Sequence, residues 1–134
     1  MAIFRTTRRI EFGDTDMAGI VHFANFFRFM ESAECEFLRT RGLSVKMDWE
    51  GVPIGFPRVS ASCDYVSPAR FEDVLDIAVT IERIGVKSVT YAFDFTRGGV
   101  AIARGKVTSV CCRAVQGKME GIEIPAGYRA RLQA

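Results

Sequence analysis

The clearest hydrophobic pattern in the chain lies between residues 23 and 41. Its apolar side chains recur at spacings of three and four, which places them on one face of an α-helix; they are Phe23, Phe26 or Phe27, Met30, Ala33 and Phe37. Charged residues, among them Glu31 and Glu34, fall largely between these positions. Asn25 is a candidate cap near the start, and Gly42 is a candidate left-handed cap at the end. The pattern predicts a helix of about 28 Å, at about 1.5 Å per residue.

Segments of alternating apolar and polar residues, typical of β-strands, flank this helix. The strand candidates are residues 2–12, 52–66, 75–81, 89–95 and 101–110. Pro53 and Pro57 favour an edge or a bend in the second candidate, and the turn Arg97-Gly98-Gly99 is a hairpin signal. Residues 43–51 are a mixed connector that could include a short helix. One helix between a first strand and a run of strands predicts an α+β fold with an antiparallel sheet of five strands.

The amino-acid composition indicates a globular protein with one hydrophobic core. A chain of 134 residues with 49% hydrophobic residues can build one core, so a single domain over residues 1–134 is expected. The basic residues are scattered and the net charge is only +2, which argues against a nucleic-acid partner. The start of the chain lacks the features of a signal peptide, and no run approaches the roughly 18 to 20 apolar residues of a membrane span. We therefore expect a cytoplasmic protein.

Cysteine and histidine usage narrows the candidate chemistry. The cysteines, which are Cys35, Cys63, Cys111 and Cys112, have no metal-like spacing and are expected to be reduced core residues. His22 is the only histidine. A histidine-based metal site is therefore not expected, and a Ser-His or Cys-His nucleophile system would have to use His22.

An acidic loop precedes the predicted helix. Asp14 and Asp16 lie between Gly13 and Gly19, and glycines let the backbone approach a ligand closely. The unpaired N–H groups of the first helical turn point toward the same loop. A carboxylate beside such donors has the parts for acyl transfer to water: the donors hold an oxyanion, and the carboxylate activates water or attacks directly. The alternative is that both aspartates make turn or capping hydrogen bonds.

The run from Glu11 to Val21, EFGDTDMAGIV, followed by Asn25 and Glu31, resembles the Asp-x-Asp-x-x-Gly-x-Val signature of hotdog-fold acyl-CoA thioesterases. It is most similar to the 4-hydroxybenzoyl-CoA thioesterase branch and its short-chain acyl-CoA relatives. The tail from Ile122 to Tyr128 also resembles that branch. The resemblance implies a hotdog fold, in which a five-stranded antiparallel sheet wraps around one long central helix.

The resemblance also implies roles for single residues. The second aspartate of the motif, Asp16, corresponds to the catalytic carboxylate, and Gly19 belongs to the same motif. The backbone N–H of Phe23 corresponds to the oxyanion donor. The family often has an aromatic pair such as Trp-Tyr or Tyr-His where this chain has His22-Phe23, so the pocket wall beside His22 is expected to differ. Glu31 is a candidate supporting carboxylate or a solvent-facing helical residue.

The segment Gly85-Val86-Lys87-Ser88 lies where related enzymes contact coenzyme A. Lys87 could meet a phosphate, and Ser88 could bind the pantetheine arm; the alternative is an exposed lysine at a strand start. Related enzymes frequently have arginines just before the lysine, whereas this chain has Gly85 and Val86. Nucleotide contacts are therefore expected to be weaker or differently placed.

The function expected from these residues is hydrolysis of an acyl-CoA, with an aromatic acyl group such as 4-hydroxybenzoyl favoured. The alternatives are a short-chain acyl-CoA or 1,4-dihydroxy-2-naphthoyl-CoA as substrate, and a non-hydrolytic acyl-CoA-binding module. A hydratase is disfavoured because its usual Asp-His motif is missing. No cofactor is expected, since coenzyme A is part of the substrate. The strands carry apolar or small residues on both faces, which predicts at least a dimer; the resemblance implies dimers often stacked into tetramers, with active sites at the subunit interface.

Overall fold

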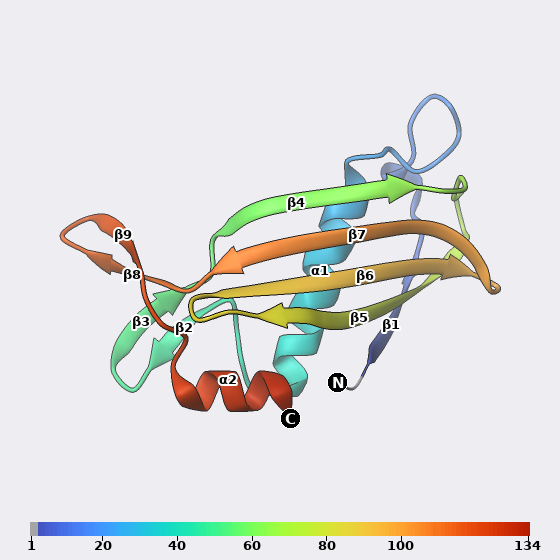
Figure 1. Cartoon of the computed structure of the whole chain (residues 1–134). Coiled ribbons are helices and arrows are strands. Elements are labelled where there is room, and N and C mark those ends of the chain that lie inside the picture. Colours follow the sequence, from blue (N-terminus) through green and yellow to red (C-terminus); the bar gives the residue numbers. More distant parts are fainter. Residues whose placement is uncertain (1–2) are drawn as a thin grey trace.

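Residues 3–134, which the computed structural model describes, fold into two antiparallel sheets, two α-helices and a short 3₁₀-helix (Figure 1). The helices are η1 (Phe12–Asp14), α1 (Asn25–Thr40) and α2 (Ala126–Gln133). The larger sheet has the spatial order β1 (Phe4–Arg9), β5 (Val74–Ile84), β6 (Ser88–Arg97), β7 (Val100–Val110) and β4 (Arg58–Tyr65). The smaller sheet has the order β2 (Lys46–Trp49), β3 (Val52–Gly55), β8 (Cys112–Val115) and β9 (Lys118–Gly121). The predicted α+β class and the five-stranded antiparallel sheet are confirmed.

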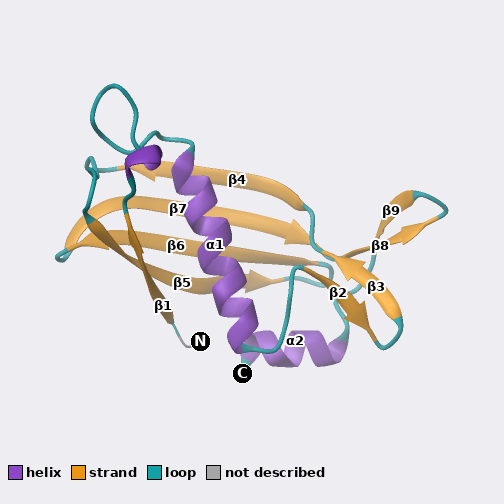
Figure 2. Ribbon diagram, turned by 180° about the vertical axis from the view of Figure 1, so that it is seen from behind, coloured by secondary structure: helices purple, strands orange, loops and turns teal. Residues whose placement is uncertain are grey.

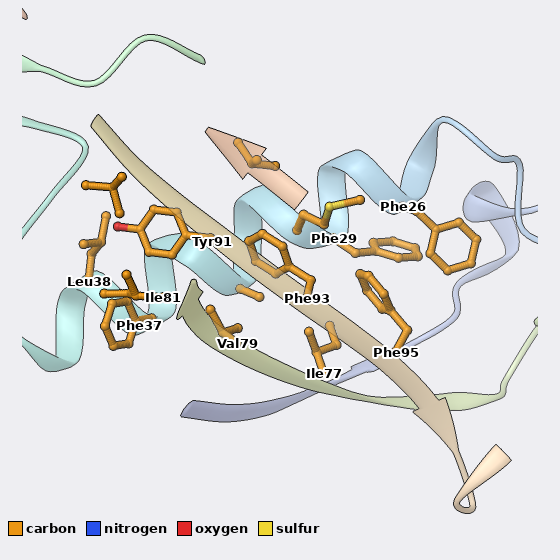
Figure 3. Close-up of a cluster of buried hydrophobic side chains, with 14 of the residues drawn as sticks. Phe26, Phe29, Phe37, Leu38, Ile77, Val79, Ile81, Tyr91, Phe93 and Phe95 are labelled. Carbon is orange, nitrogen blue, oxygen red and sulfur yellow. The ribbon is translucent and has the colours of Figure 1, made fainter. Parts of the chain in front are cut away.

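Helix α1 crosses one face of the larger sheet (Figure 2). Its buried side chains recur at helical spacing and face the alternating buried residues of β5 and β6, as Figure 3 shows for Phe26, Phe29 and Phe37. The rings of Phe26 and Phe95 lie edge to face, with centroids 5.3 Å apart. Each such side chain removed from water contributes about 1.5 to 3 kcal/mol, so this layer holds α1 on the sheet.

Strand β7 gives its small residues to this layer. Gly105 pairs with Phe93 of β6, and a Cβ built on Gly105 would lie 2.4 Å from the sulfur of Met30. A side chain at position 105 would therefore push against the helix. The alternating residues Arg104 and Lys106 are exposed on the opposite face.

The ends of α1 differ from the predicted 23–41. The helix begins at Asn25, with Ala24 as the N-cap residue and without a side-chain cap. Asn25 is thus not the cap; its side chain instead donates a hydrogen bond to the carbonyl oxygen of Asp14, at 2.9 Å. Phe23 lies ahead of the helix. At the other end, Gly42 adopts φ +68°, which confirms the predicted left-handed cap.

Several predictions on the connecting segments were wrong or incomplete. Residues 43–51 contain strand β2 and no short helix, because β2 pairs with β3. The predicted strand over residues 52–66 is two strands, β3 and β4, which belong to different sheets. Helix α2 and the hairpin of β8 and β9 were not predicted, so α1 is not the only helix. The hairpin turn at Gly98 and Gly99 is confirmed, with positive φ at both.

Strand β4 forms one edge of the larger sheet, and most of its residues are exposed. Within residues 3–134, no helix is long and apolar enough to cross a membrane.

Candidate active site

The two aspartates of the acidic loop have different environments. The carboxylate of Asp14 accepts hydrogen bonds from Arg8, at 3.2 Å to each oxygen, and from the N–H of Glu11, at 2.8 Å. Its carbonyl oxygen accepts from the N–H of His22 at 2.9 Å and from the side chain of Asn25. Asp14 therefore connects β1 and η1 to the start of α1. It has the structural role that the sequence offered as the alternative for both aspartates.

Asp16 is exposed, and its carboxylate makes few hydrogen bonds within the protein. One oxygen accepts the N–H of Ala18 at 2.9 Å, and within residues 3–134 the other has no partner. The backbone of the loop is closed by bonds from the N–H of Asp16 to Ile20 and from the N–H of Gly19 to Asp16, at 3.0 and 2.9 Å. Gly19 has φ +78°, a conformation that side chains disfavour. The loop thus presents an ionisable oxygen outward on a fixed backbone.

The backbone N–H of Phe23 stands out in the segment before α1. Its neighbours are paired: the N–H of Val21 donates to Ala69, that of His22 to Asp14, and that of Asn25 to His22. The N–H of Ala24 donates to Nδ1 of His22 at 3.2 Å. Among the residues that the structure describes, none accepts a hydrogen bond from the N–H of Phe23.

His22 is half-buried, and its ring stacks on that of Phe23 with centroids 4.8 Å apart. Because Nδ1 accepts a hydrogen bond, the proton of the neutral ring is assigned to Nε2. The Nε2–H is the polar group that His22 can offer to a ligand.

An apolar groove of about 390 Å³ lies beside the acidic loop. Its walls come from the loop itself, from the first turn of α1 and from the chain after β4; they are Ile20, Val21, Phe26, Tyr65, Val66, Ser67, Pro68 and Ala69. Tyr65 closes one side, and its hydroxyl donates to the carbonyl oxygen of Phe23 at 3.0 Å. Partial burial, together with the nearby Cys63 thiol, raises the pKa of Tyr65, so its phenol stays protonated and can donate.

Three of the residues singled out by sequence lie away from this groove. Glu31 is exposed on α1, on the side of the helix away from the core. Lys87 lies in the β5–β6 turn and Ser88 begins β6, whereas Phe26, in the helical turn that follows the acidic loop, packs on Phe95 near the other end of that strand. Seven residues of strand separate Ser88 from Phe95, about 23 Å. Figure 1 shows the acidic loop and the β5–β6 turn at opposite ends of the sheet.

The β5–β6 turn has a basic neighbour that sequence reasoning missed. Arg129 of α2 donates to the carbonyl oxygens of Gly85 and Val86, at 2.7 and 3.1 Å. The turn that carries Lys87 is therefore held by the C-terminal helix. No sequence pattern indicated this contact, because the two segments are more than forty positions apart.

Glu34 was expected between the apolar positions but is buried, with 1% of its surface exposed. Its carboxylate lies 2.7 Å from the guanidinium of Arg58. Burial raises its pKa to about 7, against the opposing effect of Arg58. The spacing contained the signal: position 34 is four after Met30 and three before Phe37, which is within the apolar stripe.

Comparison with known proteins places this geometry in a family. The family model described as "Thioesterase-like superfamily" matches residues 10–132. The chain belongs to the thioesterase-like superfamily. The family expected from the Asp16 motif, and with it the class of thioester hydrolases, is confirmed.

Among curated relatives, a 4-hydroxybenzoyl-CoA thioesterase of Pseudomonas sp. is 32% identical over 131 residues, covering 90% of this chain and 91% of the relative. A 1,4-dihydroxy-2-naphthoyl-CoA hydrolase of Nostoc punctiforme is 32% identical over 111 residues, covering 83% and 75%. Among solved structures, that of a 4-hydroxybenzoyl-CoA thioesterase complexed with 4-hydroxybenzoyl-CoA has a TM-score of 0.85 at 27% identity, covering 97% and 98%. The hotdog thioesterase fold is thus confirmed.

Proposed function

We propose that this protein hydrolyses an acyl-CoA to the free acid and coenzyme A at the acidic loop, with Asp16 as the catalytic carboxylate and the N–H of Phe23 as the oxyanion donor. The observation that carries the proposal is the pair of unused groups in one loop. Asp16 keeps a carboxylate oxygen without a protein partner, and Phe23 keeps an N–H without an acceptor, within the described residues. Asp14, two positions away, has its carboxylate fully engaged.

The chemistry suits so small a set of groups. Attack on the thioester carbonyl puts negative charge on its oxygen, which a pre-positioned N–H stabilises. Asp16 acts either as the nucleophile, forming an anhydride that water then opens, or as the base that takes a proton from the attacking water. In both cases the thiolate of coenzyme A leaves without needing an acid. Gly19 supplies the left-handed backbone conformation of the loop. The proposed steps use no metal or other cofactor, and the expectation that none is needed stays a prediction.

For the acyl group we propose an aromatic ring, of the 4-hydroxybenzoyl type. The groove beside the loop is lined by the rings of Phe26 and Tyr65 and by aliphatic residues, with Ser67 among them. The named substrates of two relatives at 32% identity, 4-hydroxybenzoyl-CoA and 1,4-dihydroxy-2-naphthoyl-CoA, are aromatic. His22, whose ring stacks on Phe23 next to Tyr65, would offer its Nε2–H to the substrate. A short-chain acyl-CoA is the alternative substrate, and acyl-CoA binding without hydrolysis is the alternative function.

We further propose that the protein works as a homo-oligomer, with residues from two copies at each site. The exposed β4 edge leaves backbone groups available for pairing with a second sheet. Lys87 and Ser88 lie at the opposite end of the sheet from the acidic loop of their own chain. We therefore propose that they contact a coenzyme A thioester bound at the loop of another copy. Glu31, exposed on α1, is proposed as a supporting carboxylate across that interface.

We also propose that residues 1–134 form one domain, in which the sheet wraps around α1 as the central helix. The family match over residues 10–132 supports this organisation. We propose a cytoplasmic location for the protein.

The deciding experiment measures free thiol released from a panel of benzoyl-type, naphthoyl and linear acyl-CoA esters. We expect turnover of an aromatic ester, and a fall in kcat of at least about 10²-fold in Asp16→Asn with binding retained. Full activity of that variant would move the chemistry elsewhere, and binding without turnover in the wild type would favour the binding module. Light scattering checks assembly: a species at the chain mass of 14.9 kDa would refute the oligomer.

A further inference from the structure

Tyr65 links two segments that are 42 positions apart in the sequence. It is the last residue of β4, and its hydroxyl donates to the carbonyl oxygen of Phe23 at 3.0 Å. The ring is held as well, because Phe26 lies against it with centroids 5.6 Å apart. Tyr65 is 47% exposed, but its hydroxyl and its ring both contact the segment at the start of α1.

The bonded carbonyl belongs to the same residue as the unused N–H. The unused N–H lies in the His22–Phe23 peptide plane, and the carbonyl of that plane, which is that of His22, accepts from the N–H of Asn25 at 2.9 Å. In the next plane, the carbonyl of Phe23 accepts from Tyr65 and, at a longer 3.4 Å, from the N–H of Phe26, and the N–H of Ala24 donates to Nδ1 of His22 at 3.2 Å. Rotation of the peptide planes around Phe23 is therefore resisted from both sides.

The side chain of Phe23 is 62% exposed, and its ring contacts those of His22 and Tyr65, with centroids 4.8 and 6.3 Å apart. Residue 23 also lies ahead of α1, so the helical hydrogen bonds do not fix it. Without the Tyr65 hydroxyl, the long bond from Phe26 would be the remaining hydrogen bond to this carbonyl among residues 3–134.

We propose that Tyr65 is a positioning residue for hydrolysis: its hydroxyl holds the backbone of Phe23 so that the N–H of Phe23 faces the reacting carbonyl. This inference rests on the proposed function. Stabilisation of an oxyanion depends on donors that are already oriented before the reaction, so the bond matters for turnover more than for substrate binding.

The test uses Tyr65→Phe, which keeps the ring against Phe26 and removes only the hydroxyl. We expect kcat for the best aromatic thioester to fall about tenfold while KM stays within about twofold. S-benzyl-coenzyme A, in which a methylene replaces the carbonyl of benzoyl-CoA, cannot accept the Phe23 hydrogen bond, and its Kd should stay within about twofold.

Tyr128→Phe is the matched control. Tyr128 also donates to a backbone carbonyl at 3.0 Å, that of Ser44, but it lies on α2 at the other end of the sheet. This variant should lower the thermal midpoint while kcat stays within about twofold.

The outcomes separate the inference from the function on which it rests. A Tyr65→Phe enzyme with wild-type kcat overturns the positioning role, even if Asp16→Asn is inactive. A loss of kcat matched by an equal weakening of S-benzyl-coenzyme A binding also overturns it, because the hydroxyl would then hold the groove and not the N–H. An active Asp16→Asn would reject the proposed function itself.

Discussion

The carboxylate of Glu34 lies 2.7 Å from the guanidinium of Arg58, between α1 and the start of β4. Glu34 has 1% of its surface exposed, so its charge is removed from water, and Arg58 offsets only part of that cost. The pair fixes the edge strand to the helix and makes stability depend on pH near neutrality.

Glu34 should stabilise the fold more in mild acid than at alkaline pH. Burial raises its pKa from 4.5 to about 7, so the folded chain binds this proton more tightly than the unfolded chain. The contribution is complete below pH 4.5 and is lost as pH rises through about 7, by on the order of 2 to 3 kcal/mol. Urea unfolding at pH 5 and pH 8, compared with Glu34→Gln, isolates the effect. A difference between the two proteins that does not change with pH would contradict it.

Asp14 and Asp16 should differ in their effects on stability. Asp14→Ala removes the bonds to Arg8 and Glu11 and should lower the free energy of unfolding by about 1 to 2 kcal/mol. Asp16→Ala removes one exposed bond and should cost less than about 0.5 kcal/mol. Denaturant titration of both variants tests this, and equal losses would mean that Asp16 is a structural turn residue.

A side chain at position 105 should destabilise the fold while Met30 is present. Gly105→Ala places a methyl group 2.4 Å from the Met30 sulfur, and overpacking of this kind costs about 1 to 3 kcal/mol. Combined with Met30→Ala, the same change should cost less than the sum of the two single effects, with a coupling of about 1 kcal/mol or more. Strict additivity in thermal unfolding would show that helix and strand are not in contact here.

Val66 should control the size of the acyl group. Its side chain lines the groove and is 58% exposed, so Val66→Trp narrows the groove without filling the core. We expect kcat/KM for a naphthoyl-CoA to fall at least about tenfold, and that for a short linear acyl-CoA to change much less. Val100→Trp, on an exposed valine of β7 outside the groove, is the control. Equal losses for both esters would place the acyl group elsewhere.

The local pattern of apolar and polar residues was sufficient to predict much of the fold. The three- and four-residue spacing from Phe26 to Phe37 predicts α1, and period-two alternation predicts β5, β6 and β7, because these elements bury one regular face each. The smaller sheet was missed since β2, β3, β8 and β9 have four residues each, too few for a period to show. Their strands form because segments more than fifty positions apart meet, as Ile54 and Arg113 do.

The sequence by itself determined the family and the loop that carries Asp16, because a turn motif is local and its residues are adjacent in the chain. Only the tertiary structure decided which aspartate is structural, since Asp14 is engaged by Arg8 of β1 and by the start of α1. It also decided that the N–H of Phe23 lies outside the helix and that Tyr65 holds the neighbouring carbonyl. Hydrogen-bond partners that are distant in the chain give no periodic pattern in the sequence. They are therefore recognised only once the chain is folded.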